Sequence, residues 1–408
     1  MYLYLKECLL LQAFFRYNEG SKNSMIQSFI QWCKKFAPYL GITALFFLLV
    51  LIVVFLFNYY SPNSAALVNQ LNPFYLLLRW DTLHYLEILT KGYQDASAFF
   101  PLYPLLIGAV SLFFPLIFSG YFISFISLAV ALYFLSQLLK EDGRQDIKDR
   151  VIILLLAFPS AMFFALIYTE SLFLALTIAF FYYLHKRSWF TAVCIGFFAA
   201  LTRNVGIFLW PVYLVAFIMA FRDLGIKTLG RQLAMYFKKK ELWYSLVIPA
   251  GLIAYCLYTY VRFDDFFGFI SAQSKWSQWK SFMWPGATLY QFYKLFFVVP
   301  ISETGLYNFM RIVVIEGGSF FILLATTIYW FAKRHWTYAV FCLFNTLLFS
   351  CMFPMISVNR YVVVIFPIFI ALAELTKKVN WLFFTIMAFF FILFIFNVYL
   401  FAMGGWVG

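Results

Sequence analysis

The sequence predicts an all-α, polytopic membrane protein, and three observations carry that prediction. Of its 408 residues, 64% are hydrophobic and 12% are charged, a balance with which a soluble domain of this size could not solvate its surface. Apolar runs recur along the whole chain, and Lys and Arg fall mainly in the short loops between them. The net charge of +13 therefore indicates orientation by the positive-inside pattern, and we expect no nucleic-acid partner.

The domain organisation is expected to be simple. Residues 1–36 form an amphipathic lead that we place in the cytosol, because it ends in Lys34-Lys35. It is not a clean signal peptide, since its first apolar run is short and a small-residue cleavage site is lacking. Residues 37–408 contain no internal repeat or low-complexity linker, so we expect one membrane domain with long outer loops at 59–100 and 262–290.

About 10–11 transmembrane helices are expected in this domain from the apolar runs. The runs are 38–57, 102–118, 121–139, 151–164, 171–184, 189–201, 205–221, 242–261, 291–300, 311–331, 336–353, 361–373 and 381–403. If the lead and the loop 140–150 are both cytosolic, three full spans cannot separate them. We expect 102–118 to be partial or re-entrant because prolines interrupt it, and 291–300 also not to span. Alternatively, the loop 140–150 faces outward.

The stretch 71–104 concentrates polar residues in a chain that has only 17 carboxylates and 3 histidines. These polar residues include Arg79, Trp80, Asp81, His84, Glu87 and Asp95. Leucines from Leu83 to Leu89 share one helix face, which is typical of a helix in a membrane interface. We expect this helix to hold Asp81 at the membrane surface as a catalytic base. In the alternative interpretation, Asp81 is the N-cap of a helix that begins at Thr82.

Further charged residues are expected on the same, outer side. Arg203 lies between two short apolar runs, where a cation is costly unless it has a partner, and a lipid phosphate suits the paired donors of Arg. Glu170 is either functional or the salt-bridge partner of Arg203. Arg360 and Tyr361 either contact phosphate or form an interfacial anchor. Glu316 lies within an apolar run, which suggests either function or a helix-end position.

A series of short motifs also runs through most of the chain. In order they are Arg79-Trp80-Asp81-x-x-His84-Tyr85, Gly92-Tyr93, Phe99-Phe100-Pro101-Leu102-Tyr103-Pro104, Pro159-Ser160, Tyr168-Thr169-Glu170-Ser171-Leu172-Phe173, Thr202-Arg203-Asn204-x-Gly206, Phe269-x-x-Ala272-Gln273-x-x-Trp276, Arg360-Tyr361 and Phe366-Pro367. Their order and spacing resemble those of PIG-V-type mannosyltransferases, which add the second mannose to GPI anchors, and of their prokaryotic relatives. Two positions depart from the family pattern, Phe158 before Pro159 and Asn204-Val205 before Gly206, and they leave the acceptor open.

The resemblance implies a GT-C-type membrane glycosyltransferase with a large first outer loop. It would move a hexose, mannose in the family, from a polyprenyl-phosphate donor to a glycolipid or glycan acceptor on the non-cytosolic face. From the residues themselves we expect no metal site and no cofactor, since no cysteines form C-x-x-C and the adjacent Asp264 and Asp265 lack further ligands. Asp81 matches the acidic base of the first outer loop. The positions expected to bind substrate are Arg79, Trp80, His84, Tyr168, Glu170, Arg203, Asn204, Gln273, Trp276, Arg360 and Tyr361. The protein would lie among the lipids of the plasma membrane in a prokaryote, or of the endoplasmic reticulum in a eukaryote.

Two other functions compete with this one. A transporter or flippase of lipid-linked sugars is the alternative, although such proteins often have paired repeats and helices broken at the midplane. Here no repeat is visible, and the polar groups cluster at one face. A structural membrane subunit is the third interpretation, which the carboxylates of the outer loops disfavour.

Overall fold

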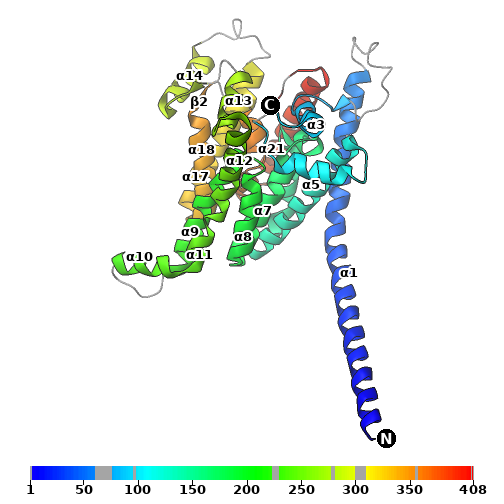
Figure 1. The fold of residues 1–408 in the computed structure, drawn as a ribbon. Coiled ribbons are helices and arrows are strands. Elements are labelled where there is room, and N and C mark those ends of the chain that lie inside the picture. The colour runs from blue at the N-terminus through cyan, green and yellow to red at the C-terminus, as the bar shows by residue number, and fades with distance from the viewer. Residues whose placement is uncertain are drawn as a thin grey trace.

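The chain folds as a bundle of helices (Figure 1). The computed structural model describes residues 2–59, 76–94, 98–222, 229–276, 281–298, 309–353, 357–405 and 407. Besides helices, this part of the chain contains one antiparallel pair of two-residue strands, β1 (Ser281–Phe282) and β2 (Met352–Phe353). The expected all-α membrane fold is confirmed.

Six helical segments in the described ranges are long and apolar enough to cross a membrane. They are Ile30–Phe57, Leu116–Glu141, Asn204–Phe221, Lys240–Phe263, Met310–Ala332 and Asn380–Ala402. Five shorter apolar helices pack with them: Leu102–Ser111, Glu170–His185, Trp189–Ala200, Trp336–Ser350 and Pro367–Thr376. At about 1.5 Å of rise per residue, the shortest of these cross only part of a hydrocarbon core of about 30 Å. The described residues thus hold six candidate spans, fewer than the 10–11 transmembrane helices expected, because several of the predicted runs form helices of 10–17 residues.

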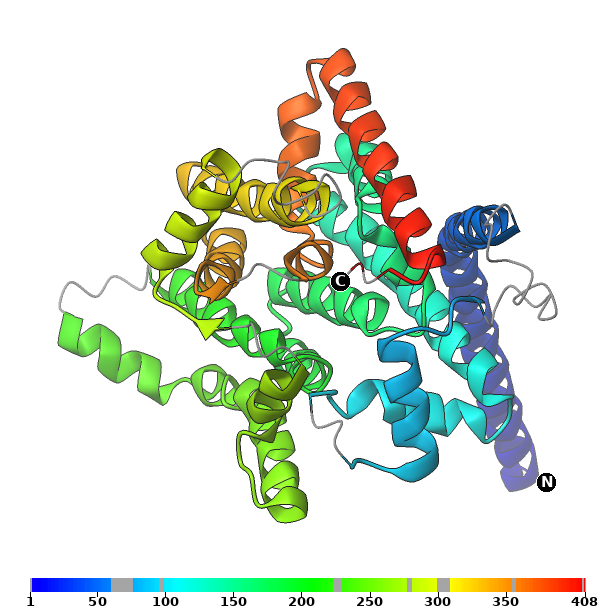
Figure 2. The same ribbon diagram turned by 90° about the horizontal axis from the view of Figure 1, so that it is seen from above.

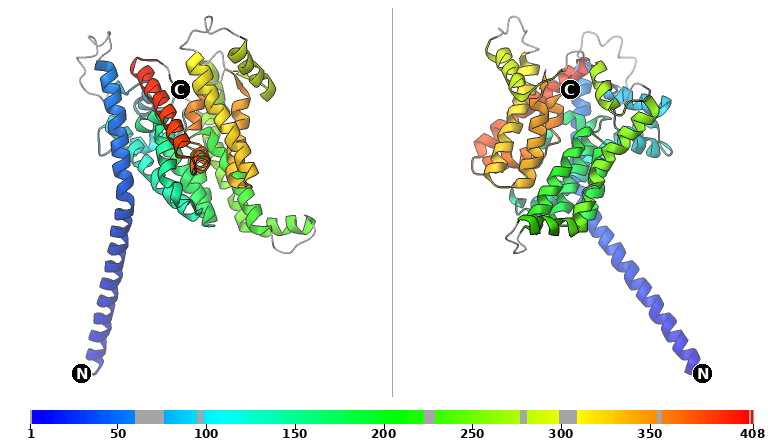
Figure 3. Two further views of the ribbon diagram at one scale, coloured as in Figure 1. Left: turned by 180° about the vertical axis from the view of Figure 1, so that it is seen from behind. Right: turned by 60° about the vertical axis from the view of Figure 1, so that its left-hand side comes forward.

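The first third of the chain holds two candidate spans and one short apolar helix before the loop 140–150. The lead and the first apolar run form one helix, α1 (Tyr2–Tyr59), which continues beyond the bundle at the end opposite α14 (Figure 3). The amphipathic stretch forms α3 (Asp81–Lys91). The proline-interrupted run gives α4 (Leu102–Ser111), ten residues long, and the chain then turns into α5 (Leu116–Glu141). The prediction of a partial helix in 102–118 is confirmed.

Many of the remaining helices are short, because turns interrupt the chain at either end of the bundle. In order they are η2 (Gln145–Ile147), α6 (Lys148–Ala157), η3 (Ala161–Ala165), α7 (Glu170–His185), α8 (Trp189–Ala200), η4 (Asn204–Phe208), α9 (Leu209–Phe221), α10 (Leu229–Lys238), α11 (Lys240–Tyr244), α12 (Val247–Phe263), α13 (Gly268–Trp276), α14 (Pro285–Phe297), the π-helix η5 (Phe309–Gly317), α17 (Gly318–Ala332), α18 (Trp336–Ser350), α19 (Val358–Val362), α20 (Pro367–Thr376) and α21 (Asn380–Ala402). The short α14 lies at the α3 end of the bundle and is not one of the candidate spans (Figure 1), as expected for 291–300.

The helix breaks bring distant residues to one end of the bundle. α6 ends before Pro159, and the chain passes through η3 before α7 begins at Glu170. α8 ends just before Arg203, and η4 then packs on it so closely that a Cβ at Gly206 would lie 2.4 Å from the carbonyl oxygen of Ala199. Viewed from above, α3 lies across this end of the bundle (Figure 2).

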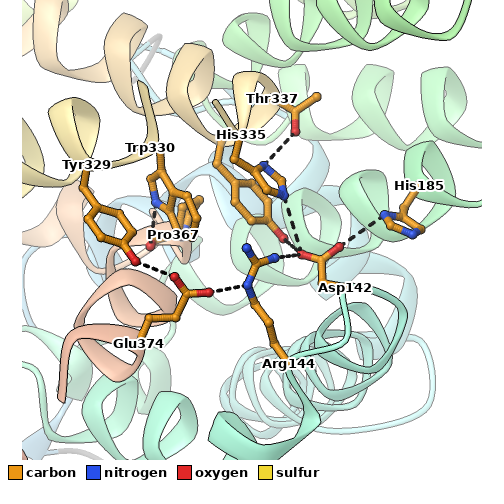
Figure 4. A network of polar contacts seen from close by, with 10 residues as sticks. Asp142, Arg144, His185, Tyr329, Trp330, His335, Thr337, Pro367 and Glu374 are labelled. Atoms are coloured by element: carbon orange, nitrogen blue, oxygen red, sulfur yellow. Dashed lines mark hydrogen bonds and ion pairs between the residues drawn. The ribbon is translucent and has the colours of Figure 1, made fainter. Parts of the chain in front are cut away.

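A polar cluster joins the helices at the opposite end (Figure 4). Asp142 follows α5 and accepts a hydrogen bond from Tyr338 Oη at 2.7 Å, and it pairs with Arg144 at 2.8 Å and with His185 at 3.2 Å. Arg144 also pairs with Glu374 of α20. These contacts tie the ends of α5, α7, α18 and α20 together, so this cluster is structural.

His335 gives this cluster an expected pH dependence. Burial lowers the pKa of His335 to about 4, although the negative charge of Asp142 acts to raise it. A folded-state pKa below the unfolded one means that the unfolded chain binds the proton more readily, so stability should fall as the pH drops from roughly 6.5 toward 4. The His335→Phe variant keeps a ring against Tyr338 and cannot titrate. Thermal unfolding across this window should therefore show a shallower slope for the variant, and equal slopes would contradict the assignment.

Candidate active site

Asp81 is the first residue of α3 and is partly exposed. The helix follows Trp80, whose φ of 55° places a non-glycine residue in the left-handed region, a conformation that costs roughly 1–3 kcal/mol and clusters at functional sites. Trp80 occupies the N-cap position and no side chain caps the helix. The alternative in which Asp81 caps a helix starting at Thr82 is therefore wrong. The Asp81 side chain is 19% exposed.

The aromatic motif after α3 holds this helix in place. Tyr85 of α3 packs edge-on against Phe99 and Tyr103, with ring centroids 4.9 and 5.0 Å away. The Phe99 carbonyl oxygen accepts hydrogen bonds from Tyr93 Oη at 3.0 Å and from Tyr255 Oη of α12 at 2.8 Å. This motif thus fixes α3 on its neighbours, and with it the position of Asp81.

Arg360 connects Asp81 to the interior. Its Nη2 lies 2.6 Å from Asp81 Oδ2, and its Nε pairs with Glu170. The guanidinium also stacks over the rings of Tyr168 and Phe163, 4.6 and 5.2 Å from their centroids. Arg360 is only 8% exposed. The alternative that Arg360 is an interfacial anchor is therefore wrong.

Glu170 is fully buried at the start of α7 and binds two arginines through one oxygen. Its Oε1 lies 2.5 Å from Arg203 Nη1 and also receives Arg360. Arg203 Nη1 donates to Thr169 Oγ1 at 3.0 Å, and the guanidinium lies 4.2 Å from the ring centroid of Tyr361. The salt bridge between Glu170 and Arg203 that the sequence suggested is confirmed. Glu170 Oε2, by contrast, has no hydrogen-bond partner among the described residues.

Asp81, Arg360, Glu170 and Arg203 thus form a chain of alternating charge that is formally neutral. Burying charges is expensive unless they are paired with good geometry, and three members of this chain are almost completely buried. Asp81 is the member at its exposed end. Asp81 is therefore the member of this chain that solvent reaches most readily.

Arg79 is a further cation at this end of the bundle. Its Nε donates to the Leu76 carbonyl oxygen at 3.2 Å, and its guanidinium lies 5.9 Å from the centroid of the Phe401 ring. Its own carbonyl oxygen accepts from Tyr168 Oη at 3.2 Å. Burial lowers the pKa of Arg79, but an arginine stays charged at neutral pH. In the described part of the chain, no carboxylate pairs with Arg79.

The other predicted substrate-binding residues fall into three groups. Trp80 is 40% exposed beside Asp81, and His84 stacks on Phe99 at 5.1 Å. Asn204 accepts the Val205 N–H at 2.9 Å and so opens η4. Gln273 and Trp276 belong to α13 at the same end of the bundle (Figure 1), and their side chains lie outside the described part of the chain.

An apolar cavity of about 690 Å³ lies beside α3. Its lining comes from α3, α4, α12 and the loops between them: Ile88, Leu89, Tyr93, Pro101, Pro104, Leu105, Gly108, Ala109, Leu112, Leu201, Ala254, Tyr255 and Tyr258. Ile88 and Leu89 of its lining lie about two helical turns along α3 from Asp81. A cavity of this size and character suits hydrocarbon.

Comparisons with known proteins give one structural likeness. No protein-family model matches the chain, and no curated protein sequence matches it. Among solved structures, the chain is similar to the crystal structure of ArnT from Cupriavidus metallidurans bound to undecaprenyl phosphate, with 15% sequence identity and a TM-score of 0.46. The match covers 83% of this chain and 60% of the ArnT chain, so this chain spans less than two thirds of the length of ArnT. A likeness at this level assigns neither a family nor an activity.

Proposed function

We propose that this protein is a GT-C-type membrane glycosyltransferase that moves a hexose, mannose in particular, from a polyprenyl phosphate to a glycolipid or glycan acceptor on the non-cytosolic face. The observation that carries the proposal is the charged chain at one end of the bundle, with Asp81 as its partly exposed carboxylate. The plasma membrane of a prokaryote is the proposed location. The motifs that resemble PIG-V-type enzymes support mannose as the sugar.

The proposed chemistry assigns the proton transfer to Asp81. The carboxylate accepts the proton of the acceptor hydroxyl, and the hydroxyl oxygen attacks the anomeric carbon of the sugar. The bond from that carbon to the phosphate oxygen breaks, and polyprenyl phosphate leaves with the bonding electrons. General-base help of this kind contributes roughly 10²–10⁴-fold. Arg360 orients the carboxylate from the side opposite the substrate.

Arg79 is the proposed contact for the donor phosphate. Arg203 and Arg360 already hold carboxylates, whereas Arg79 has no such partner in the described residues. This proposal shifts the phosphate contact from Arg203, which the sequence favoured, to Arg79. The exposed ring of Trp80 is placed to pack on a sugar, and the apolar cavity beside α3 is proposed to take the lipid chain.

The function is tested by transfer of labelled mannose. Purified protein in detergent is given radiolabelled polyprenyl-phosphate mannose and a glycolipid extract, and covalently labelled glycolipid is measured. A flippase makes no such product, because it changes only the side of the membrane on which a lipid lies. Labelled donor that crosses proteoliposomes without any product would replace the proposal with the flippase function.

The role of Arg79 leads to a specific prediction. The Arg79→Gln variant should raise the KM for donor by roughly 10- to 100-fold, because a charge-assisted hydrogen bond worth about 1.5–3 kcal/mol is lost. The donor KM of the Arg79→Lys variant should lie between those of wild type and Arg79→Gln, since lysine keeps the charge but loses the paired N–H donors of the guanidinium. Donor titrations measure both. Arg203→Gln is the comparison and should mainly lower thermal stability; a larger rise in donor KM for Arg203→Gln would return the phosphate contact to Arg203.

A further inference from the structure

Glu316 is a buried carboxylate that the proposed chemistry does not use. It lies near the end of the π-helix η5, directly before α17, and is 2% exposed. π-helical turns are rare and often occur at functional sites. Its two oxygens accept two different backbone hydrogen bonds, Oε1 from the Ser357 N–H at 3.0 Å and Oε2 from the Asn359 N–H at 2.8 Å.

These two N–H groups belong to the turn that opens α19. Ser357 has a φ of 70°, in the left-handed region, and such a residue persists only where its surroundings determine it. The carbonyl oxygen of Asn359 accepts a further hydrogen bond from Ser160 Oγ at 2.7 Å. The backbone of Asn359 is therefore held on both sides, and the next residue is Arg360.

We infer that Glu316 is a positioning residue, which sets the place of Arg360 through the backbone of Asn359 and thereby orients the carboxylate of Asp81. Arg360 bonds Asp81 and Glu170 through different nitrogens, so a shift of its backbone disturbs both contacts. As far as it concerns transfer, this inference rests on the proposed function.

A carboxylate suits this position better than an amide. Two backbone donors need two acceptors, and both oxygens of a carboxylate accept. In Glu316→Gln, the amide nitrogen would face one of the two N–H groups, which puts a donor against a donor. The turn must then move or leave a buried N–H without a partner. Small misplacements near a reacting group cost up to about 100-fold in rate.

The test is a double-mutant cycle between Glu316→Gln and Asp81→Asn, read as kcat for sugar transfer. If Glu316 acts through Arg360 on Asp81, Glu316→Gln should lower kcat by roughly 10- to 100-fold in the wild-type background. The donor KM should change by less than about threefold, and the effect on kcat should nearly vanish when residue 81 is Asn. Equal loss of kcat in both backgrounds would mean that Glu316 supports only the fold, and would overturn the inference.

Thr327→Val supplies the matched control. Thr327 is a buried polar residue of the neighbouring helix α17, and its hydroxyl lies 2.8 Å from Thr346 Oγ1 of α18. This variant should lose stability without a change in kcat. Should Glu316→Gln fail to fold, Glu316→Asp replaces it, because it keeps two acceptor oxygens on a shorter arm and should show the same dependence on Asp81.

A second readout separates failure of this inference from failure of the proposed function. Thermal unfolding of Glu316→Gln, Arg360→Lys and the double variant needs no substrate. Residues that act through one network give non-additive shifts in Tm, whereas independent residues give additive ones. Absence of transfer by the wild-type protein would end the proposed function and leave this measurement intact. Additive shifts in Tm would overturn the positioning role.

Discussion

The Asp81→Asn variant should lose sugar transfer by roughly 10²–10⁴-fold while remaining folded. The amide keeps the size of the side chain and still accepts a hydrogen bond from Arg360, but it cannot take the proton of an acceptor hydroxyl. Because Trp80 holds the N-cap position, loss of a helix cap cannot explain a defect. The measurement is transfer by the purified variant, with thermal unfolding recorded in parallel.

Glu87→Gln is the matched control for that experiment. Glu87 lies on the same helix, is exposed, and pairs only with the exposed Lys91 at 3.1 Å in the described structure, a contact worth little. Its variant should retain both transfer and stability. Near-normal transfer by folded Asp81→Asn enzyme would remove Asp81 from the mechanism, and the acceptor proton would need another base.

Much of the fold was predictable because membrane-spanning helices consist of long apolar runs, which are visible in the sequence. The run 381–403 became α21 (Asn380–Ala402), and the prolines around 102–118 correctly predicted a helix too short to span. The continuity of α1 through the lead was not predicted. The charges near the end of the first 36 residues were interpreted as a boundary although charged residues continue a helix well, and α1 also continues through Pro38.

The pairing of the site residues was predictable only in part. A cation between two apolar runs must find a partner, and the sequence left two partners open for Arg203, a lipid phosphate and Glu170. The burial of Arg360 did not follow, because it depends on a left-handed Ser357 and on a carboxylate, Glu316, that lies 43 residues before Asn359 in the chain. No local pattern in the sequence connects these residues. Their contact arises from the packing of η5 against α19.

The distinction between the two carboxylates also needed the structure. Asp81 and Glu170 both lie at helix starts, where a negative charge is favoured by the helix dipole. The resemblance favoured Asp81 as the base, and Glu170 remained open between a functional role and a salt bridge to Arg203. Burial separates them, since Asp81 is partly exposed and Glu170 is not exposed at all. Glu170 then becomes the anchor of two arginines, and its removal should act on stability first.

The Glu170→Gln variant should lose roughly 3–5 kcal/mol of stability, the cost of removing one partner from a buried ion pair. Arg203 would remain buried without its carboxylate partner, and Arg360 would keep only Asp81. Denaturant unfolding in detergent measures the loss, with Glu87→Gln, expected within about 0.5 kcal/mol of wild type, as the exposed control. A double variant that also changes Arg203 to Met should recover part of the loss, because one uncompensated charge disappears with its partner. A Glu170→Gln protein as stable as the control would mean that the interior already screens these arginines, and that the charged chain does not depend on its central carboxylate.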